Sequence, residues 1–378
     1  MNKYVRGRRM FFLLTLKRTH LILITFIIST LILSVSFYNA SPLMTSTPID
    51  ESHNQIIEEI LSTRNNGFLD GNSEVIESMY DKNTKLGTWA YEHQMKKMKY
   101  LHNWAEKQGV IFSNIKSKFK IRTVKESSNT VSYNFIASTE YSYVYENEPQ
   151  TENFFRIGTY HSLKLLKDDN SWLIAKEWYT DPFADSLDLE NLKTEEFEEY
   201  ILSSNSRDFS SLNKRRINAV EYADRYCGAA ADEEFGFNYN KKYRDYNPLG
   251  GDCANFASQI LFEGGKFKKT GTWNYTKDGS KSWVNAQAFK DYMINSSRAS
   301  LIAKGTYNQV FKASFKLLPG DFVAYEKKGK ITHISVVTGA DSKGYSLVNC
   351  HNTDRYRVPW DLGWNNKNIK FWLVRVHY

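Results

Sequence analysis

The chain has 378 residues, of which 41% are hydrophobic and 24% charged. The formal net charge of +8 does not indicate nucleic-acid binding, because six basic residues between positions 3 and 18 supply most of it. No acidic residue precedes position 21, and the remainder of the chain carries only +2, so no nucleic-acid partner is expected.

An uncharged apolar run, residues 21–37, follows the basic residues. Its length lies between that of a signal-peptide core and that of a bilayer span. The basic flank predicts that the N-terminus stays in the cytoplasm and that the remainder is exported. Tyr38 interrupts the small-residue cleavage pattern that would end at Ala40, so we favour an uncleaved membrane anchor over a cleaved signal.

Residues 48–183 have the length of one domain and combine two hydrophobic periods. Helical spacing predicts helices near residues 56–61, 75–80 and 86–105, and alternation predicts antiparallel strands from residue 119 onward. This order of helices followed by a curved sheet is similar to the NTF2-like cone fold. Such a domain would serve as a spacer or a wall-binding module.

Three tyrosines alternate at Tyr141, Tyr143 and Tyr145. They could line a cavity of the cone or stack on sugars. We favour the simpler interpretation that they are strand-forming aromatics that face core or solvent. Residues 184–205, with acidic side chains between 190 and 199, are expected to form a short helix and a linker.

A single cysteine follows two glycines at the predicted start of a helix. Behind glycines 250–251, Asp252 is placed as helix cap, and apolar residues recur at helical spacing over 253–261 until glycines 264–265 end the helix. Backbone N–H groups in the first turn favour the thiolate, which attacks carbonyl carbon. Cys253 is therefore a candidate nucleophile, and the alternative is a small core residue.

Three strands are predicted near the C-terminus, at residues 320–325, 331–338 and 345–351. The second strand carries His333, the candidate general base for the thiol. On the third strand, Asn349 and His351 share a face because side chains alternate along a strand.

The register of the last hairpin decides which side chain lies opposite His333. If the hairpin is symmetric about the turn at 340–344, Gly339 pairs with Tyr345 and His333 lies opposite His351, with Cβ atoms roughly 5 Å apart. A slip of two residues would place Asn349 there instead. A nucleophile on a helix, a base on a strand and an orienting group on the next strand follow the papain-like order.

The exported chain contains only three cysteines, so at least one thiol is free or pairs between molecules. Cys253 is the candidate for the free thiol. Cys227 and Cys350 could be bridged, but we expect two isolated buried thiols. No closely spaced cysteine and histidine ligands indicate a zinc site.

The string GGDC-x-NF-x-SQ at residues 250–259 is the most specific motif of the chain. With it, residues 206–378 resemble the putative amidase domain family of Gram-positive bacteria, which is related to the papain-like NlpC/P60 and CHAP domains. The resemblance also includes these pieces: 213–226, 264–265, Trp283, 320–322, 332–333 and 350–355.

The resemblance implies a cysteine amidase or peptidase with Cys253 as nucleophile and His333 as general base. His351 is our choice for the third catalytic residue, with Asn349 and Asp354 as alternatives. No metal or organic cofactor is expected. The implied partner is a peptide or cell-wall amide substrate.

These predictions describe an α+β protein with a papain-like C-terminal domain, its cysteine helix packed on an antiparallel sheet, an NTF2-like domain and an N-terminal membrane helix. The expected division is as follows: basic cytoplasmic tail, 1–20; anchor or signal, 21–37; NTF2-like domain, 48–183; linker, 184–205; amidase domain, 206–378. The function predicted is that of an exported cysteine amidase, membrane-anchored or secreted. The alternatives are a non-catalytic wall- or peptide-binding protein and a thiol transpeptidase.

Overall fold

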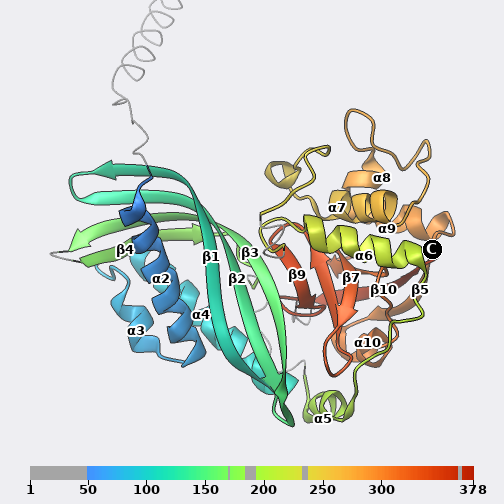
Figure 1. Cartoon of the computed structure of the whole chain (residues 1–378), viewed down its shortest axis with the longest axis horizontal. Coiled ribbons are helices and arrows are strands. Elements are labelled where there is room, and N and C mark those ends of the chain that lie inside the picture. Colours follow the sequence, from blue (N-terminus) through green and yellow to red (C-terminus); the bar gives the residue numbers. More distant parts are fainter. Residues whose placement is uncertain (1–48, 169–170, 184–192, 232–236, 365–367) are drawn as a thin grey trace, which may run out of the picture. The chain divides into compact units, whose positions relative to one another are not determined.

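The computed structural model describes residues 49–378, apart from 169–170, 184–192, 232–236 and 365–367 (Figure 1). Residues 47–378 form one compact unit. The predicted tail at 1–20 and the predicted anchor at 21–37 lie outside the described residues. Within the described ranges, no helix has both the length and the apolar character needed to cross a bilayer.

Three helices open the described chain, as the sequence predicts: α2 (Glu51–Leu69), α3 (Ser73–Ser78) and α4 (Lys85–Gln108). Each begins where a short polar side chain, Asp50, Asn72 or Thr84, accepts a backbone N–H of the first turn. Helix α4 ends at Gly109, whose φ of 66° lies in the left-handed region that glycine adopts without strain.

Long antiparallel strands follow these helices: β1 (Val110–Ser127), β2 (Thr130–Tyr145), β3 (Glu148–Asp168) and β4 (Ser171–Tyr179). The three tyrosines at 141–145 belong to the end of β2. Helix α2 packs against β1 and α4 against β4, so the helices cover one face of this part of the sheet (Figure 1). The alternating apolar residues predicted these strands because alternate side chains face that covered side.

The C-terminal half adds six more β-strands to the same sheet: β5 (Ala299–Gly305), β6 (Phe322–Lys327), β7 (Lys330–Ala340), β8 (Ser346–Cys350), β9 (Asp354–Pro359) and β10 (Ile369–Val376). Strands β6 to β10 lie in the centre of the sheet, and β5 forms its edge. The strand order is β1-β2-β3-β9-β8-β7-β6-β10-β5, with β4 beside β3. Pairing of β3 with β9 therefore joins strands from the two predicted domains in one ten-stranded antiparallel sheet. The α+β class is confirmed, whereas the papain-like and NTF2-like assignments stay predictions.

The remaining helices are short: α5 (Glu195–Ser203), α6 (Lys214–Tyr226), the 3-10 helix η2 (Asn247–Leu249), α7 (Cys253–Gln259), α8 (Lys281–Val284), α9 (Ala286–Asn295) and α10 (Tyr307–Ser314). Helix α7 continues as one turn of π-helix, η3 (Ile260–Gly264), and ends at Gly265. Helices α6, α7 and α9 pack against β7, which places the start of α7 beside the central strands of the sheet.

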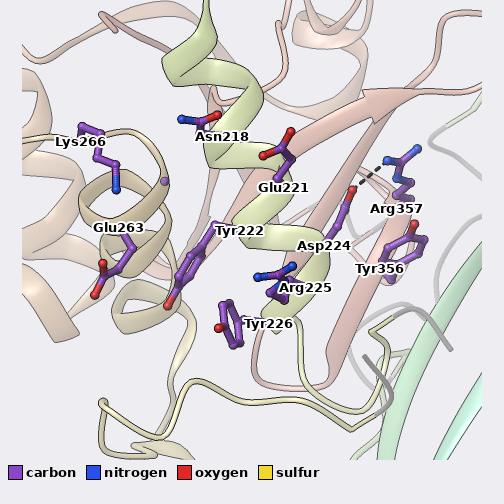
Figure 2. Close-up of a pocket in the computed structure, with 11 residues that line it drawn as sticks. Asn218, Glu221, Tyr222, Asp224, Arg225, Tyr226, Glu263, Lys266, Tyr356 and Arg357 are labelled. Atoms are coloured by element: carbon purple, nitrogen blue, oxygen red, sulfur yellow. Dashed lines mark hydrogen bonds and ion pairs between the residues drawn. The ribbon is translucent and has the colours of Figure 1, made fainter. Parts of the chain in front are cut away.

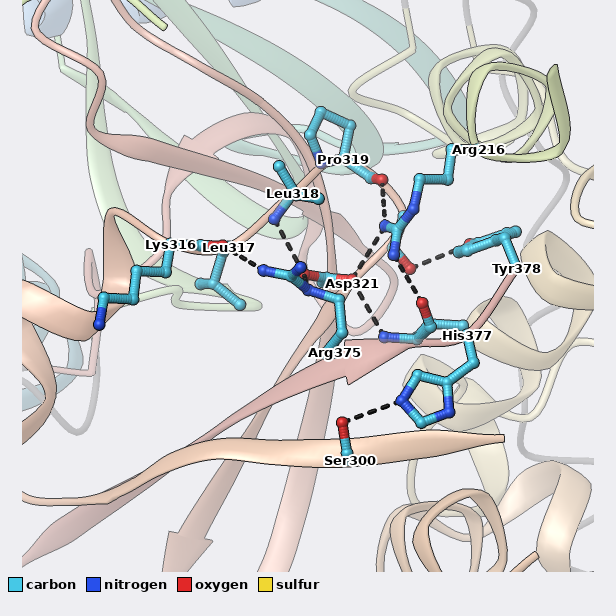
Figure 3. A network of polar contacts seen from close by, with 12 residues as sticks. Arg216, Ser300, Lys316, Leu317, Leu318, Pro319, Asp321, Arg375, His377 and Tyr378 are labelled. Carbon is cyan, nitrogen blue, oxygen red and sulfur yellow. Dashed lines mark hydrogen bonds and ion pairs between the residues drawn. The ribbon is translucent and has the colours of Figure 1, made fainter. Parts of the chain in front are cut away.

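A buried carboxylate ties the C-terminal strand to α6 (Figure 3). The Asp321 side chain accepts hydrogen bonds from Arg216 at 2.9 Å and from Arg375 at 2.7 Å, and also from the backbone N–H groups of Leu318 and Val376. Because these donors satisfy its charge, Asp321 can remain fully buried. The Gly-Asp-Phe motif at 320–322 thus supports the framework behind the candidate site.

The two faces of the C-terminal strands pack into different hydrophobic clusters, because neighbouring side chains on a strand point to opposite faces. The cluster on the face of α7 includes Cys253, Phe256, Phe322, Ala324, Ile334 and Val336. The other includes Val323, Tyr325, Val337, Trp360 and the core of the N-terminal half.

Candidate functional site

Cys253 is the first residue of α7, as predicted, and two glycines shape the approach to it. Gly250 and Gly251 have φ values of 109° and 139°, in the region that side chains rarely adopt. A Cβ at Gly251 would also collide with the side chain of Asn352. The glycines therefore allow the turn before α7 to pass closely under the loop that follows β8.

Asp252 occupies the N-cap position, but its side chain makes no cap hydrogen bond to the helix. One carboxylate oxygen accepts the Tyr246 backbone N–H at 3.1 Å and the Asn255 amide at 2.8 Å, and the other lies 2.6 Å from Nδ1 of His351. The prediction that the Asp252 side chain caps the helix is therefore wrong, because its carboxylate binds the buried imidazole of His351 instead.

His351 lies directly after β8 and is fixed on all sides. Its Nδ1 faces Asp252, its Nε2 lies 2.9 Å from the carbonyl oxygen of Tyr226, and its ring stacks on Phe256 with centroids 3.8 Å apart. A carbonyl only accepts hydrogen bonds, so Nε2 carries a proton, and Nδ1–H donates to the carboxylate. This geometry describes an imidazolium paired with Asp252.

The electrostatics of His351 agree with that geometry. Burial alone would lower the pKa of His351, but the hydrogen bond and charge of Asp252, with help from Asp354 and the Tyr226 carbonyl, raise it to about 9. Both ring nitrogens are thus occupied at neutral pH.

His333 lies in β7 with its ring between Tyr325 and Trp364, at centroid distances of 5.5 and 5.0 Å. Its Nε2 is buried and has no hydrogen-bond partner among the described residues. Burial, reinforced by the charge of Arg355, lowers the pKa of His333 to about 3, so the ring is neutral. Tyr325 belongs to the hydrophobic cluster on the other face of the strands from Cys253.

The predicted register of the β7–β8 hairpin is wrong. Gly339 pairs with Leu347 instead of Tyr345, and the paired segment ends at Val336 and Asn349. The strand partner of His333 is Tyr325 of β6. An irregularity between Val337 and Gly339 shifts the pairing, and sequence symmetry about the turn contains no sign of it.

Cys253 and His333 lie on opposite faces of β7, and the thiol meets only the backbone of the residue after the histidine. The N–H of Ile334, the residue after His333, hydrogen-bonds toward the Cys253 thiol. No hydrogen bond joins the thiol to either candidate histidine within the described ranges. The Cys253 side chain is 5% exposed, and burial raises its pKa to about 12, although the N–H groups of Ile334 and Ala254 oppose the shift. The predicted lowering of the Cys253 pKa is wrong, because desolvation of the thiolate raises the pKa by more than the N–H groups at the helix start lower it.

The two alternatives for the third catalytic residue are held by other partners. Asn349 accepts the Thr338 hydroxyl at 2.8 Å and donates to Asp224 at 2.9 Å. Asp354 accepts the Ala229 backbone N–H at 2.8 Å and also the Tyr239 hydroxyl. Both side chains therefore fix the loops around β8 and β9 in this structure.

Residues 213–374 match the family model described as a putative amidase domain. The match supports the family resemblance that the motif predicted for residues 206–378, and it suggests amide hydrolysis at a general level.

Other comparisons add little to the amidase assignment. No curated protein matches the chain. The solved structures that match include the intermembrane space region of the chloroplast protein ARC6, at 10% identity and a TM-score of 0.25, covering 35% of this chain and 98% of that one. Bd1075 of Bdellovibrio bacteriovorus matches at 14% identity and a TM-score of 0.22, covering 35% of this chain and 42% of that one. Both scores are too low to assign a fold.

A groove of about 630 Å³ runs beside α6 in the amidase segment (Figure 2). Its wall combines side chains of both charges with three tyrosines: Asn218, Glu221, Tyr222, Asp224, Arg225, Tyr226, Glu263, Lys266, Tyr356 and Arg357. Asp224 and Arg357 pair at 2.8 Å across it. Since the Tyr226 carbonyl binds His351, one end of the groove lies next to the pair formed by His351 and Asp252.

All three cysteines of the amidase segment are free and buried, and burial raises the pKa of Cys350 to about 11. The expectation of isolated thiols at Cys227 and Cys350 is confirmed. Residues 49–378, outside the gaps given above, contain no group of side chains suited to holding a metal ion.

Sequence reasoning missed the pairing of Asp252 with His351. The usable signal was the acidic residue directly before the candidate nucleophile, which was assigned to capping because capping is its commonest role at that position.

Proposed function

We propose that the amidase segment hydrolyses an amide bond of a peptide or cell-wall substrate, with Cys253 as nucleophile and His333 as general base. One observation carries this assignment. His333 has a buried ring nitrogen with no hydrogen-bond partner in the described part of the chain, and the backbone N–H of the next residue, Ile334, contacts the Cys253 thiol. A base needs such a free nitrogen to take the thiol proton.

His351 is the less suitable base because Asp252 and Tyr226 occupy both of its ring nitrogens. It is better described as a positioning residue. By holding Asp252, it fixes the turn directly before Cys253 and the start of α7. We infer that this contact sets the position of the sulfur relative to β7.

In the proposed reaction, Nε2 of His333 takes the thiol proton, and the sulfur attacks the amide carbonyl carbon. The backbone N–H of Cys253 would donate to the developing oxyanion. The C–N bond then breaks, and the amine leaves with the proton from the imidazolium. Water attacks the resulting thioester, releases the acid and restores the thiol.

The resting structure is closed, with the thiol nearly buried and the His333 ring turned toward Tyr325 and Trp364. Because His333 lies with Tyr325 on the face of β7 away from Cys253, the proposed reaction requires a rearrangement of β7 itself, since rotation of the side chain alone cannot carry the ring through the sheet. The groove beside α6 is the proposed entry for the substrate, because its polar and tyrosine-rich wall fits a peptide. We place the activity outside the cytoplasm, on an anchored or secreted protein.

Purified cell-wall fragments incubated with the full-length protein and read by mass spectrometry would test the proposal. We expect new amine and carboxylate ends that disappear in Cys253→Ala and in His333→Gln. Cys350→Ala is the matched control, since it removes another buried thiol from the same region. Hydrolysis that persists in Cys253→Ala at the wild-type rate would overturn the assignment.

The second candidate is a non-catalytic peptide-binding protein. Two observations favour it: the Cys253 thiol is buried, and both ring nitrogens of His351 are already hydrogen-bonded. Neither group is arranged for proton transfer in this structure. Unchanged fragments that bind to both wild-type protein and Cys253→Ala would support this candidate.

A further inference from the structure

Helices α2 and α4 pack on one face of strands β1 to β4 (Figure 1), and the opposite face of the same strands carries a group of exposed lysines. The strand register places these lysines on one side, because residues that lie opposite each other in an antiparallel pair share a face. We call this surface the basic face, and its lysines are Lys116, Lys118, Lys120, Lys125, Lys164 and Lys176.

One row of the basic face crosses all four strands and contains three of the lysines. Lys125 of β1 lies opposite Ser132 of β2, which lies opposite Lys164 of β3. Lys164 in turn lies directly opposite Lys176 of β4. Like charges in such a pair destabilise a sheet, so this row favours an anion bound between them. None of the three ammonium groups forms a hydrogen bond or an ion pair with another described residue.

The carboxylates of these strands do not balance the row. Glu140, on the same face, forms an ion pair with Arg156 at 2.7 Å. Glu152 and Asp168 lie near the opposite ends of β3, and Glu152 accepts a side-chain hydrogen bond at 3.0 Å. Glu177, beside Lys176 in the chain, points to the helix-covered face and binds Arg64 there. The lysine row therefore carries an excess of positive charge.

Two exposed aromatic side chains border the row. Trp178 lies two residues beyond the last lysine of β4 and is 57% exposed. It lies opposite Ser162, which makes Tyr160 its diagonal neighbour on β3, and Tyr160 is 41% exposed. Such diagonal neighbours are within reach of each other's rings. An indole or phenol ring presents a flat apolar surface of the kind on which the C–H face of a sugar ring stacks.

The basic face continues along β1 toward the amidase segment. Its lysines at 116–120 occupy alternate positions, and Lys116 and Lys125 lie about 30 Å apart along the extended strand. In the same cross-strand row as Lys116, Arg156 lies over the ring of Tyr356, 5.2 Å from its centroid, and Tyr356 also lines the groove beside α6. A positive surface of this length fits a linear polymer better than a single small anion.

We propose that the basic face binds a linear anionic polysaccharide. The lysines pair with its anionic groups, and Trp178 and Tyr160 stack on its sugar rings. The hydroxyl groups of Ser132 and Ser162, which lie between the lysines, match the hydroxyls of a sugar chain. The binding does not depend on the proposed hydrolysis, because no residue of the basic face belongs to the candidate site.

Polygalacturonate is the probe, because each of its sugars carries a carboxylate and a highly methyl-esterified preparation supplies a neutral polymer with the same backbone. Calorimetric titration of the full-length protein at low salt should show binding of polygalacturonate and much weaker binding of the ester. The affinity should fall as salt is added, since neutralisation of a polyanion releases counterions. Absence of binding to polygalacturonate, or equal binding of the ester, would overturn the proposal.

Paired variants separate the basic face from the net charge of the protein. Lys164→Gln combined with Lys176→Gln should weaken polygalacturonate binding about tenfold or more and make its salt dependence shallower. Lys85→Gln combined with Lys96→Gln is the matched control, since it removes two exposed lysines from α4 on the helix-covered side, and should bind like the wild type. An equal loss of affinity in the two double variants would contradict the proposal.

A second pair of variants separates a polysaccharide from other polyanions. Trp178→Ala should weaken polygalacturonate binding about three- to tenfold. Trp89→Ala, which removes a 54% exposed tryptophan from α4, should leave the affinity unchanged. Polyphosphate, which has charge but no rings, should bind equally to the wild type and to Trp178→Ala. Unchanged polygalacturonate binding in Trp178→Ala, or tighter binding of single-stranded DNA than of polygalacturonate, would overturn the assignment to a polysaccharide.

Discussion

Nδ1 of His351 lies 2.6 Å from the Asp252 carboxylate, immediately before the candidate nucleophile. The pair joins the loop after β8 to the start of α7, and the second nitrogen of His351 extends the contact to the end of α6 through Tyr226. Three segments that are distant in sequence are thereby held around Cys253 by one imidazole ring. This arrangement makes His351 important for structure before any chemistry begins.

Replacement of His351 should destabilise the protein strongly. In His351→Ala, the Asp252 carboxylate stays buried without its cation, and breaking such a pair costs about 3–5 kcal/mol. Chemical unfolding should show this loss. His377→Ala is the control, because His377 is exposed, and should change stability little. A loss in His351→Ala no larger than in His377→Ala would contradict the structural role.

The same pair should make stability depend on pH. The pKa of His351 is about 9 in the folded protein, above the ordinary value of 6.5, so its contribution is complete below pH 6.5 and lost as pH rises through 9. The shift corresponds to about 3 kcal/mol. Unfolding free energies measured between pH 6 and 10 should show this fall in the wild-type protein and a flatter profile in Asp252→Asn. Parallel profiles would exclude the linkage.

Sequence patterns predicted the elements of the fold well, since hydrophobic spacing reports burial directly. The three N-terminal helices, the helix that starts at Cys253 and the alternation of β1 to β4 all occur as expected. The pairing of β3 with β9 was not predicted, because contacts between distant strands leave no periodic signal in either strand.

For the candidate site, too, the sequence predicted local features but not the contacts between distant residues. Local sequence predicted that Cys253 begins a helix behind two glycines. It did not predict which side chain meets which, because the hairpin register depends on one irregularity near Gly339. The pKa of Cys253 was also misjudged, since the N–H groups at a helix start are visible in sequence and the burial of the sulfur is not.

Two of the three tyrosines at the end of β2 bind a carboxylate. The Tyr143 and Tyr145 hydroxyls donate to Asp341, at the turn between β7 and β8, at 3.0 and 2.7 Å. Tyr145→Phe leaves that buried carboxylate short of a donor and should cost about 1–3 kcal/mol in unfolding free energy. Tyr141→Phe is the matched control and should cost less, since the Tyr141 hydroxyl has no hydrogen-bond partner among the residues that the structure describes. Equal losses of unfolding free energy in Tyr145→Phe and Tyr141→Phe would show that the hydrogen bond to Asp341 does not stabilise the protein.

Asp341 itself should respond to acid in the opposite sense to a paired surface carboxylate. Burial raises the pKa of Asp341 to about 6 from 3.8, although the two tyrosines and the N–H groups of its own turn oppose the shift. The folded state therefore binds this proton more tightly, and the Asp341 contribution to stability should increase as pH falls from about 6 toward 4. The unfolding free energy of the wild-type protein, relative to that of Asp341→Asn, should therefore increase as the pH falls from about 6 toward 4. A constant difference would contradict it.

The thiol of Cys253 should alkylate slowly in the resting protein and still faster than the other two thiols. Its pKa of about 12 leaves little thiolate at neutral pH, and the thiolate is the reactive form. Access orders the three residues, because Cys253 is 5% exposed whereas Cys227 and Cys350 are 0% and 1% exposed. Iodoacetamide labelling followed by peptide mass spectrometry at pH 7 should therefore modify Cys253 first, at a rate well below that of a free cysteine peptide.

If substrate binding opens the site as proposed, added wall fragments should change the rate at Cys253 and leave the rates at Cys227 and Cys350 unaltered. Rapid labelling of Cys253 without substrate would show that the closed arrangement does not persist in solution, and equal rates at all three positions would indicate that global unfolding controls access.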